Sequence, residues 1–279
     1  MTASPIDYLV VGHLAKDVKE DGFGLGGTVT YAAICAARLG RNVGVVTACE
    51  PGIDLQKVFP ATSVSRAPSL TSTVFKNVYN NNERSQKILS RAVELSIEQV
   101  PSHWRDTRLV HLAPIAGEMA TDIIDALGGR FVGLTLQGWL RAWDSAGRVS
   151  FKVWAEAPKV LPKVNAVVLS EADVAYREDL MDYFANLAPV AVVTLGRHGA
   201  RVHWEGAWYL FPAFPAKEVD PTGAGDVFAT AFFHRFEQSG DPLASTAFAS
   251  CAASFSVGGV GIVSIPTLRM VERRLEGEE

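Results

Sequence analysis

Short apolar runs of strand length alternate along this chain with longer stretches whose apolar residues have helical spacing. The strand-like runs are Ile6–Gly12, Val43–Thr47, Leu109–Ala113, Phe131–Leu136, Ala166–Leu169 and Val190–Leu195. The helix-like stretches include Thr28–Leu39, Ala116–Leu127 and Arg177–Leu187. Apolar strands that alternate with helices are typical of a parallel sheet with helices on both faces. The pattern therefore predicts an α/β fold of three layers with a mostly parallel central sheet.

Two regions depart from this alternation. Residues Val64–Leu89 alternate polar and apolar side chains around the turn-like Asn80-Asn81-Asn82, as antiparallel strands do. We expect them to form a small flap of strands beside the main sheet. Residues Gly199–Phe211 predict a hairpin that turns at Glu205-Gly206. The chain after Gly225 is predicted to be helical over Asp226–Gln238, Pro242–Val257 and Pro266–Leu275.

The composition narrows the classes of partner and compartment. The chain has 279 residues, a formal net charge of -4 and no cluster of Lys and Arg, so neither nucleic acid nor an anionic membrane is an expected partner. No apolar run reaches the ~18 residues that span a bilayer, and the N-terminus lacks the pattern of a secretory signal. The cysteines are odd in number and far apart in the sequence: Cys35, Cys49 and Cys251. This spacing argues against disulfides and favours free cysteines in the core of a protein from a reducing compartment. We therefore expect a cytoplasmic protein.

The most informative segment is Asp220-Pro221-Thr222-Gly223-Ala224-Gly225-Asp226, directly before a long apolar helix. Small residues let several backbone N–H groups converge at the helix N-terminus, where unpaired amides and the helix dipole favour an anion. Asp226 lies in the first helical turn, so a helix cap is the simpler interpretation of this carboxylate taken alone. An amide nest beside a carboxylate is also what phosphoryl transfer needs. The amides neutralise the transferred group, and the carboxylate takes the proton of the acceptor hydroxyl.

Two rival nucleotide-binding motifs are missing from the sequence. There is no G-x-x-x-x-G-K-[ST] segment, and no G-x-G-x-x-G follows the first strand. The first absence excludes a Walker-type loop, and the second argues against a dinucleotide-binding oxidoreductase.

The segment Asp220–Asp226, followed by Val-Phe-Ala-Thr-Ala-Phe, resembles the C-terminal signature of the ribokinase-like (PfkB-type) carbohydrate kinases. Weaker matches in the family order are Gly12–Asp17, Gly26-Gly27, Thr194–Gly199, Ala252–Ser254 and Val257–Gly261. The resemblance implies a single ribokinase-like kinase domain over residues 1–279, with lid strands from about 13–25 and 64–90. It also implies ATP as the phosphoryl donor and a small molecule as the hydroxyl substrate.

The resemblance carries roles over to individual residues. Asp226 is the expected catalytic base, and the amides of Gly223, Ala224 and Gly225 are the expected anion hole. Asp17, Gly26 and Gly27 are expected to contact the substrate. The expected nucleotide contacts are Thr194, Gly196, Gly199, Thr222, Ala253, Val257 and Gly258.

The resemblance also implies Mg²⁺, held mostly by phosphates and water, and names K⁺ as a further candidate. Asp220 is the residue expected near a monovalent cation. The family's N-x-x-E motif corresponds to Ser170-Glu171-Ala172-Asp173, where both key positions differ. Asp173 is therefore a candidate for the magnesium site, and the alternative is that it only begins a helix with a favourable charge.

Other departures concern the acceptor side of the site. Family members often carry Asn shortly after the Gly-Gly pair, and here the corresponding residue is Tyr31. Gln137 and Arg141 follow an apolar strand, where α/β folds place ligand contacts, and Arg141 is a candidate to brace a phosphate. The alternative for Arg141 is a surface loop. His13 and Asn77 are further candidates for substrate contacts, against a structural role for His13.

The main hypothesis is an ATP-dependent kinase acting on a hydroxyl of a small polyol, sugar or nucleoside. The segments around Tyr31 and Arg141 resemble the inositol-kinase-like branch more than ribokinase itself. The alternative is a relative that binds ligands as a sensor and has lost efficient catalysis, motivated by the altered Ser170–Asp173 segment. Short flap strands could also pair across a two-fold axis, so a monomer and a homodimer are both open.

Overall fold

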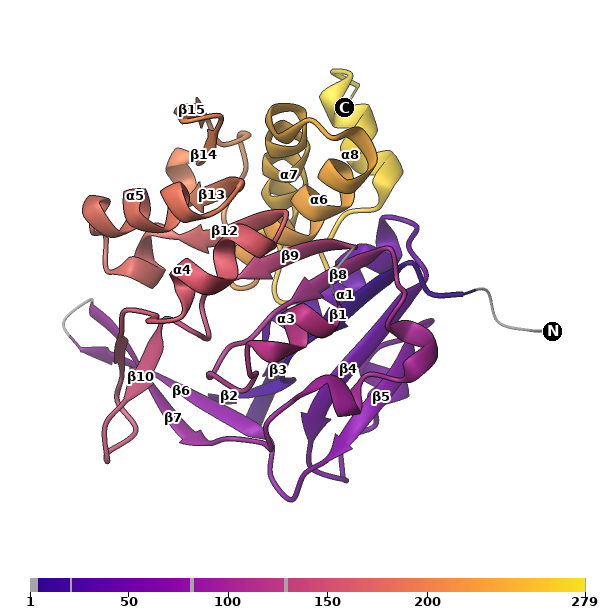
Figure 1. Cartoon of the computed structure of the whole chain (residues 1–279), viewed down its shortest axis with the longest axis vertical. Helices are drawn as coiled ribbons and strands as arrows, with labels where there is room; N and C mark the ends of the chain where they lie inside the picture. The colour runs from indigo at the N-terminus through magenta and orange to yellow at the C-terminus, as the bar shows by residue number, and fades with distance from the viewer. Residues whose placement is uncertain (1–4, 21, 81–82, 128–129, 279) are drawn as a thin grey trace.

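The structure is a computed structural model that describes residues 5–20, 22–80, 83–127 and 130–278 (Figure 1). In this described part, the middle layer is a nine-stranded sheet with the order β15-β14-β13-β12-β9-β8-β1-β4-β5. The strands from β13 to β5 pair in parallel, whereas β13, β14 and β15 pair antiparallel. The strand bounds are Tyr8–Val11 (β1), Val43–Cys49 (β4), Ser63–Pro68 (β5), Leu109–Leu112 (β8), Phe131–Thr135 (β9), Ala166–Ser170 (β12), Val190–Thr194 (β13), Ala200–Trp204 (β14) and Ala207–Phe211 (β15).

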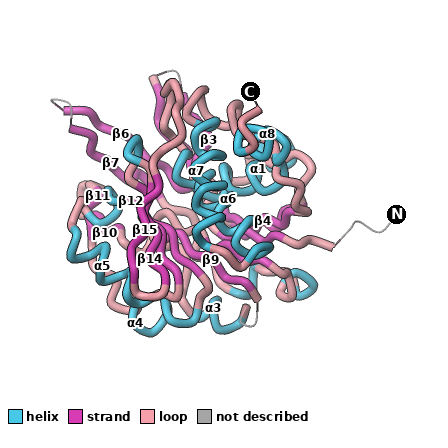
Figure 2. The backbone as a smooth tube through the Cα atoms, turned by 90° about the horizontal axis from the view of Figure 1, so that it is seen from above, coloured by secondary structure: helices cyan, strands magenta, loops and turns pink. Residues whose placement is uncertain are grey.

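Helices cover both faces of this sheet, as Figure 2 shows from above. One face carries α1 (Thr28–Arg38), α6 (Ala224–Ser239), α7 (Pro242–Ser256) and, against α7, α8 (Leu268–Leu275). The other face carries α3 (Asp122–Ala126), α4 (Ala157–Val160) and α5 (Glu178–Leu187), and α2 is Leu55–Val58. Side chains of a buried parallel strand alternate between the two faces, so Tyr8 and Val10 join one core while Leu9 and Val11 join the other. The predicted three-layer α/β fold is confirmed.

A second sheet of four strands lies beside the central one and is called the lid sheet below. Its strands are, in spatial order, β3 (Gly22–Gly26), β2 (Ala15–Lys19), β6 (Thr73–Asn80) and β7 (Glu83–Ser90). Residues 64–68, expected in the flap, instead form most of β5 and pair with β4 at the edge of the central sheet. An edge strand is half exposed and so alternates polar and apolar residues as a flap strand does, which explains the wrong placement.

A small hairpin of β10 (Arg141–Trp143) and β11 (Val149–Phe151) was not anticipated from the sequence. The Ile88 amide of the lid sheet donates to the carbonyl of Gly147 at its tip, over 2.9 Å. At its base, the rings of Trp139 and Trp154 stack with centroids 4.7 Å apart. The hairpin therefore connects the lid sheet to the core.

The helix expected over Ala116–Leu127 is confined to Asp122–Ala126. The buried carboxylate of Glu118 accepts the backbone N–H groups of Ile115 and Ala116, and these bonds hold a loop where the sequence suggested a helix. Short 3-10 turns occupy Ile97–Gln99, Ser102–Trp104, Leu161–Lys163, Glu171–Val174 and Gly196–His198. Within the described residues, none of the helices is both long and apolar enough to cross a membrane.

The contact between β9 and α6 depends on the absence of a side chain at Gly133. A Cβ atom there would lie 2.7 Å from carbon atoms of the Phe233 ring, which packs from α6. We expect Gly133→Ala to lower the free energy of unfolding by about 1–3 kcal/mol, because the ring must move in a closely packed core. Urea denaturation measures the change.

Gly52→Ala is the matched control, because no atom lies within 4 Å of a Cβ built at this exposed position. Equal stability of the two variants would show that Phe233 moves at no cost and would contradict the packing argument.

Candidate active site

A cavity of about 1030 Å³ opens at the carboxyl ends of the parallel strands. The strand ends contribute Thr135 (β9), Ser170 (β12) and Thr194 (β13), and the lid sheet contributes Phe75 and Gln86. This edge is where α/β sheets bind ligands, because the loops that leave the strands surround it. The volume is at the upper end of small-molecule sites, so it can take two substrates side by side.

The N-terminal turn of α6 forms one wall of the cavity. Gly223 begins the helix with φ of 80°, a left-handed conformation that favours glycine, and no side chain caps the helix. The Ala224 amide donates to the carbonyl of Pro221 over 3.2 Å. The amides of Gly225 and Asp226 follow it in the first turn, where helical N–H groups lack intrahelical acceptors. The amides of Gly225 and Asp226 are therefore available to an anion, whereas the amide of Ala224, expected in the anion hole, is already used by the turn before the helix.

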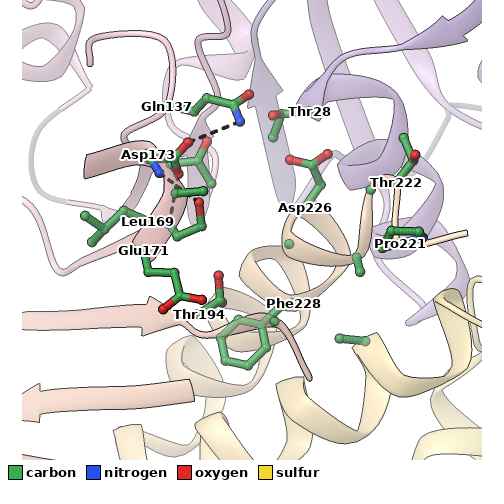
Figure 3. A pocket seen from close by; sticks show the side chains of 18 of the residues that line it. Thr28, Gln137, Leu169, Glu171, Asp173, Thr194, Pro221, Thr222, Asp226 and Phe228 are labelled. Atoms are coloured by element: carbon green, nitrogen blue, oxygen red, sulfur yellow. Dashed lines mark hydrogen bonds between the residues drawn. The ribbon is translucent and has the colours of Figure 1, made fainter. Parts of the chain in front are cut away.

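Asp226 faces the cavity from this first turn, close to Thr28 at the start of α1 (Figure 3). The residue is half-buried, and the partial removal of its carboxyl group from bulk water raises its pKa to about 6. The Thr28 hydroxyl and the Arg141 guanidinium act in the opposite direction, whereas the carboxylates of Asp173 and Asp17 raise the pKa further. Above pH 6 the carboxyl group is ionised. Because its pKa is higher than that of an ordinary aspartate, the carboxylate also has a higher affinity for a proton. Both properties suit a general base.

The side chains of Asp17, Gln137 and Arg141 line the end of the cavity nearest the lid sheet. Arg141 donates from Nη1 to the carbonyl of Ile115 over 3.0 Å, and its guanidinium lies 5.4 Å from the centre of the Phe75 ring. Arg141 is therefore held in the cavity wall rather than on an exposed loop.

Ser170 and Asp173 form a capping box at the start of a short helical turn. The Asp173 carboxylate accepts the Ser170 amide over 2.8 Å and the Gln137 side-chain amide over 3.3 Å (Figure 3). Asp173 therefore begins a helical turn, which was the alternative to a role at the magnesium site. It also lines the cavity. Among the described residues no group of three or more His, Cys, Asp and Glu side chains is placed to hold a metal. One or two carboxylates with phosphates and water suit Mg²⁺, so the donor set fits that ion bound through a substrate.

Asp220 lies apart from the cavity wall. One of its carboxylate oxygens accepts the Thr222 amide over 2.9 Å, and the other accepts the Gly261 amide over 3.4 Å. Burial raises the pKa of Asp220, but these hydrogen bonds outweigh it and leave the pKa below its ordinary value. Asp220 therefore joins the signature loop to the loop around Gly261.

Of the expected nucleotide contacts, the cavity wall includes all except Gly258: Thr194, Gly196, Gly199, Thr222, Ala253 and Val257. Of the expected substrate contacts, Asp17, Gly27 and Gln137 line it, whereas His13, Gly26 and Asn77 do not. Gly26 lies behind Asp17, whose carboxylate occupies the space that a Cβ would fill.

His13 has a structural position. Its ring is fully buried, and its two nitrogen atoms lie 2.7 Å from the Thr73 hydroxyl and 2.7 Å from the carbonyl of Val93. Burial lowers the pKa of His13, which fits a neutral ring that joins the lid sheet to the core. Asn77 accepts a hydrogen bond from Gln86 over 3.2 Å, and Gln86 is the member of this pair that reaches the cavity.

Sequence reasoning missed several lining residues. Thr28 lies inside the apolar run that predicted a helix, and Ser85 and Gln86 lie on a strand whose register the sequence does not set. Thr28 follows the Gly26-Gly27 pair, and this adjacency was the one signal that could have identified it.

The fold is that of the ribokinase family. A solved pyrophosphate-dependent kinase in the ribokinase family, complexed with a pyrophosphate analog and myo-inositol, superposes with a TM-score of 0.81 at 21% identity over 95% of this chain and 99% of its own. The cytidine kinase of Thermococcus kodakarensis is 26% identical over 85% of this chain and 91% of its own length. An inositol 3-kinase of Oryza sativa subsp. japonica is 26% identical over 94% of this chain and 70% of its own length.

Residues 163–268 match the pfkB family carbohydrate kinase model. This match contains the signature segment, the Asp226 turn and the strand that ends at Thr194. Over this C-terminal segment the chain is similar to the pfkB family of carbohydrate kinases.

The raised pKa of Asp226 has a consequence for stability. Below pH 4 the carboxyl is protonated in the folded and unfolded chain alike. Above pH 6 it is ionised in both, and burial then costs stability. We expect Asp226→Asn to raise the free energy of unfolding at pH 8 by on the order of 1–2 kcal/mol. The gain should disappear as the pH falls through 6 towards 4.

Thermal unfolding of both proteins from pH 4 to pH 8 measures this difference. Asp122→Asn, on the exposed start of α3, is the control for loss of one charge. A destabilised Asp226→Asn protein at pH 8 would show that the carboxylate is held by favourable contacts and is not strained by burial.

Proposed function

We propose that this kinase is an ATP-dependent phosphotransferase for a hydroxyl group of a small polyol, sugar or nucleoside, with Asp226 as the general base. The observation that carries the proposal is the position of Asp226, a half-buried carboxylate with a pKa of about 6 in the same helical turn as the amides of Gly225 and Asp226. A proton acceptor and an anion site then lie within one turn of α6. The family and the two curated kinase relatives support the same class of reaction.

In the proposed reaction the acceptor lies between the lid sheet and α6, held by Asp17 and Gln137. Asp226 takes the proton of the reacting hydroxyl as its oxygen attacks the terminal phosphorus of the donor. The bond from that phosphorus to the bridging oxygen breaks, and ADP leaves. The amides of Gly225 and Asp226 stabilise negative charge on the transferred group, and Arg141 neutralises it from the opposite wall.

ATP is proposed as the donor because the cavity continues from the α6 turn to Ala253 and Val257 on the side away from the lid sheet. That extension offers room for a nucleoside beyond the phosphates, with Thr194 and Gly196 beside them. Mg²⁺ bound to the donor phosphates would neutralise their charge, with Asp173 the candidate carboxylate that would hold it through water. Asp220 stays the candidate for K⁺.

We further propose that the chain acts as a single kinase domain whose lid sheet closes over the acceptor. Phe75, Ser85 and Gln86 of that sheet line the cavity, so movement of the sheet changes access to it. Closure would exclude water and suppress hydrolysis of the donor.

The direct test measures phosphoryl transfer from ATP to a panel of myo-inositol, ribose and cytidine. We expect turnover of at least one acceptor, and Asp226→Asn should lower kcat by about a hundredfold to ten-thousandfold, the usual contribution of one general base. The exposed Asp122→Asn variant should keep full activity. Undiminished turnover by Asp226→Asn would remove Asp226 from the role of base.

The donor is tested separately by supplying pyrophosphate or ATP at equal concentration. We expect ATP to support turnover with the higher kcat/KM, since its nucleoside would contact the extension near Ala253 and Val257, which pyrophosphate is too short to reach. A preference for pyrophosphate would contradict ATP dependence and leave the assignment of the base intact.

The pH dependence follows from the same pKa. With saturating donor, log kcat/KM for the acceptor should rise by one unit per pH unit below about 6 and level off above it. The ionised base is lost as the pH falls through its pKa. A profile that stays flat from pH 5 to pH 8 would mean that no group with this pKa takes the proton.

A second candidate is a ligand-binding relative without efficient catalysis. The observation that favours it is the use of the Asp173 carboxylate in a capping box and in a bond to Gln137, which leaves it less able to serve magnesium. Thermal shifts with the acceptors and ATP, without any ADP formed, would support this candidate over the kinase.

A further inference from the structure

Tyr31 reaches the cavity from the first turn of α1. Tyr31 as a whole is only 5% exposed. Its hydroxyl oxygen nevertheless does not belong to the described side-chain atoms that are fully buried without a hydrogen-bond partner. The described residues give that hydroxyl no hydrogen-bond partner. Buried tyrosine hydroxyls usually find a partner, so this one faces the cavity with its bonding capacity unused.

The ring of Tyr31 is fixed in place by the signature loop. Its Cδ1, Cε1 and Cζ atoms occupy the space where a Cβ at Gly223 would lie, and a Cβ there would be 2.6 Å from Cζ. The ring therefore packs flat on the residue that begins α6. This contact sets the position of the hydroxyl relative to Asp226.

The charges around Tyr31 determine what its hydroxyl can do. Burial raises the pKa of Tyr31, and the carboxylates of Asp226, Asp220 and Asp17 raise it further. The hydroxyl is therefore protonated at neutral pH. Asp17 and Asp226 can only accept hydrogen bonds when ionised, so Tyr31 supplies a donor next to these two acceptors.

We propose that Tyr31 determines acceptor specificity by donating a hydrogen bond to a hydroxyl next to the one that is phosphorylated. This inference rests on the proposed function. The reacting hydroxyl gives its proton to Asp226, while its neighbour accepts from Tyr31 and donates to Asp17. One hydroxyl can accept and donate a hydrogen bond at the same time. A substrate with a single hydroxyl cannot supply both the reacting hydroxyl at Asp226 and the neighbouring one at Tyr31. The site therefore selects vicinal diols, as in polyols and sugars, over isolated hydroxyls.

The test compares the best acceptor of the panel with its monodeoxy analogues, each lacking one hydroxyl next to the reacting one. For Tyr31→Phe we expect kcat/KM with the full acceptor to fall about tenfold to a hundredfold, through loss of one buried hydrogen bond. With the analogue that lacks the recognised hydroxyl, the same variant should match the wild type within about twofold. The KM for ATP should stay unchanged.

Tyr183→Phe, at a partly exposed tyrosine of α5 outside the cavity wall, is the matched control and should keep wild-type kinetics. Partial misfolding of Tyr31→Phe would scale both acceptors equally. The ratio of kcat/KM for the full and deoxy acceptors therefore reports on the hydroxyl independently of the folded fraction.

The outcomes separate the inference from the proposed function. If Asp226→Asn abolishes turnover but Tyr31→Phe keeps the wild-type ratio for every analogue, the role of Tyr31 is overturned and the base stands. If Tyr31→Phe raised only the KM for ATP, the Tyr31 hydroxyl would contact the donor instead of the acceptor, and the inference would also be overturned. If no acceptor of the panel is phosphorylated or shifts the melting temperature, both proposals fall.

Discussion

The packing of α1 against α6 holds the candidate active site together. Helix α1 is buried along Thr28–Ala36, and its small side chains let α6 approach closely enough for Cys35 Sγ to lie 3.9 Å from the carbonyl of Val227. Both helices begin at a glycine without a side-chain cap, Gly27 and Gly223, and both beginnings line the cavity. Two uncapped helix N-termini on one wall favour anions there, which suits a site that transfers a phosphoryl group.

Two aspartates six positions apart in the signature have opposite environments. Asp220 has its pKa lowered because backbone amides bond its carboxylate, whereas Asp226 has its pKa raised by burial in the cavity wall. Such separation of pKa values distinguishes a structural carboxylate from one that exchanges protons. An ionised Asp226 lowers the stability of the folded chain, and such a cost agrees with its proposed role as the base.

The central layers of the fold could be predicted from sequence because buried parallel strands are continuous apolar runs. The flap boundary was wrong at 64–68, since an exposed edge strand has the same alternation as a flap. The hairpin of β10 and β11 escaped prediction because strands of three residues carry too little periodicity to detect. Its connection to the lid sheet is a backbone bond from Ile88, which no side-chain pattern encodes.

The site could be predicted where one segment carries it, as in Gly223–Asp226, and less well where it is assembled from distant elements. His13 was expected at the substrate because it follows the first strand. Its ring instead lies within hydrogen-bond distance of Thr73 and Val93, where it is buried and connects the lid sheet to the core. Tyr31 was noted only as a departure from the family pattern. Its contact with Gly223 joins residues far apart in the chain, and such contacts follow from the fold alone.

A crystal structure of the complex with the preferred acceptor, Mg²⁺ and a non-hydrolysable ATP analogue tests the central claim most directly. We predict one acceptor hydroxyl about 2.6–3.2 Å from a carboxylate oxygen of Asp226, with the terminal phosphate at the amides of Gly225 and Asp226. An acceptor hydroxyl out of reach of Asp226, with the terminal phosphate away from the start of α6, would contradict it.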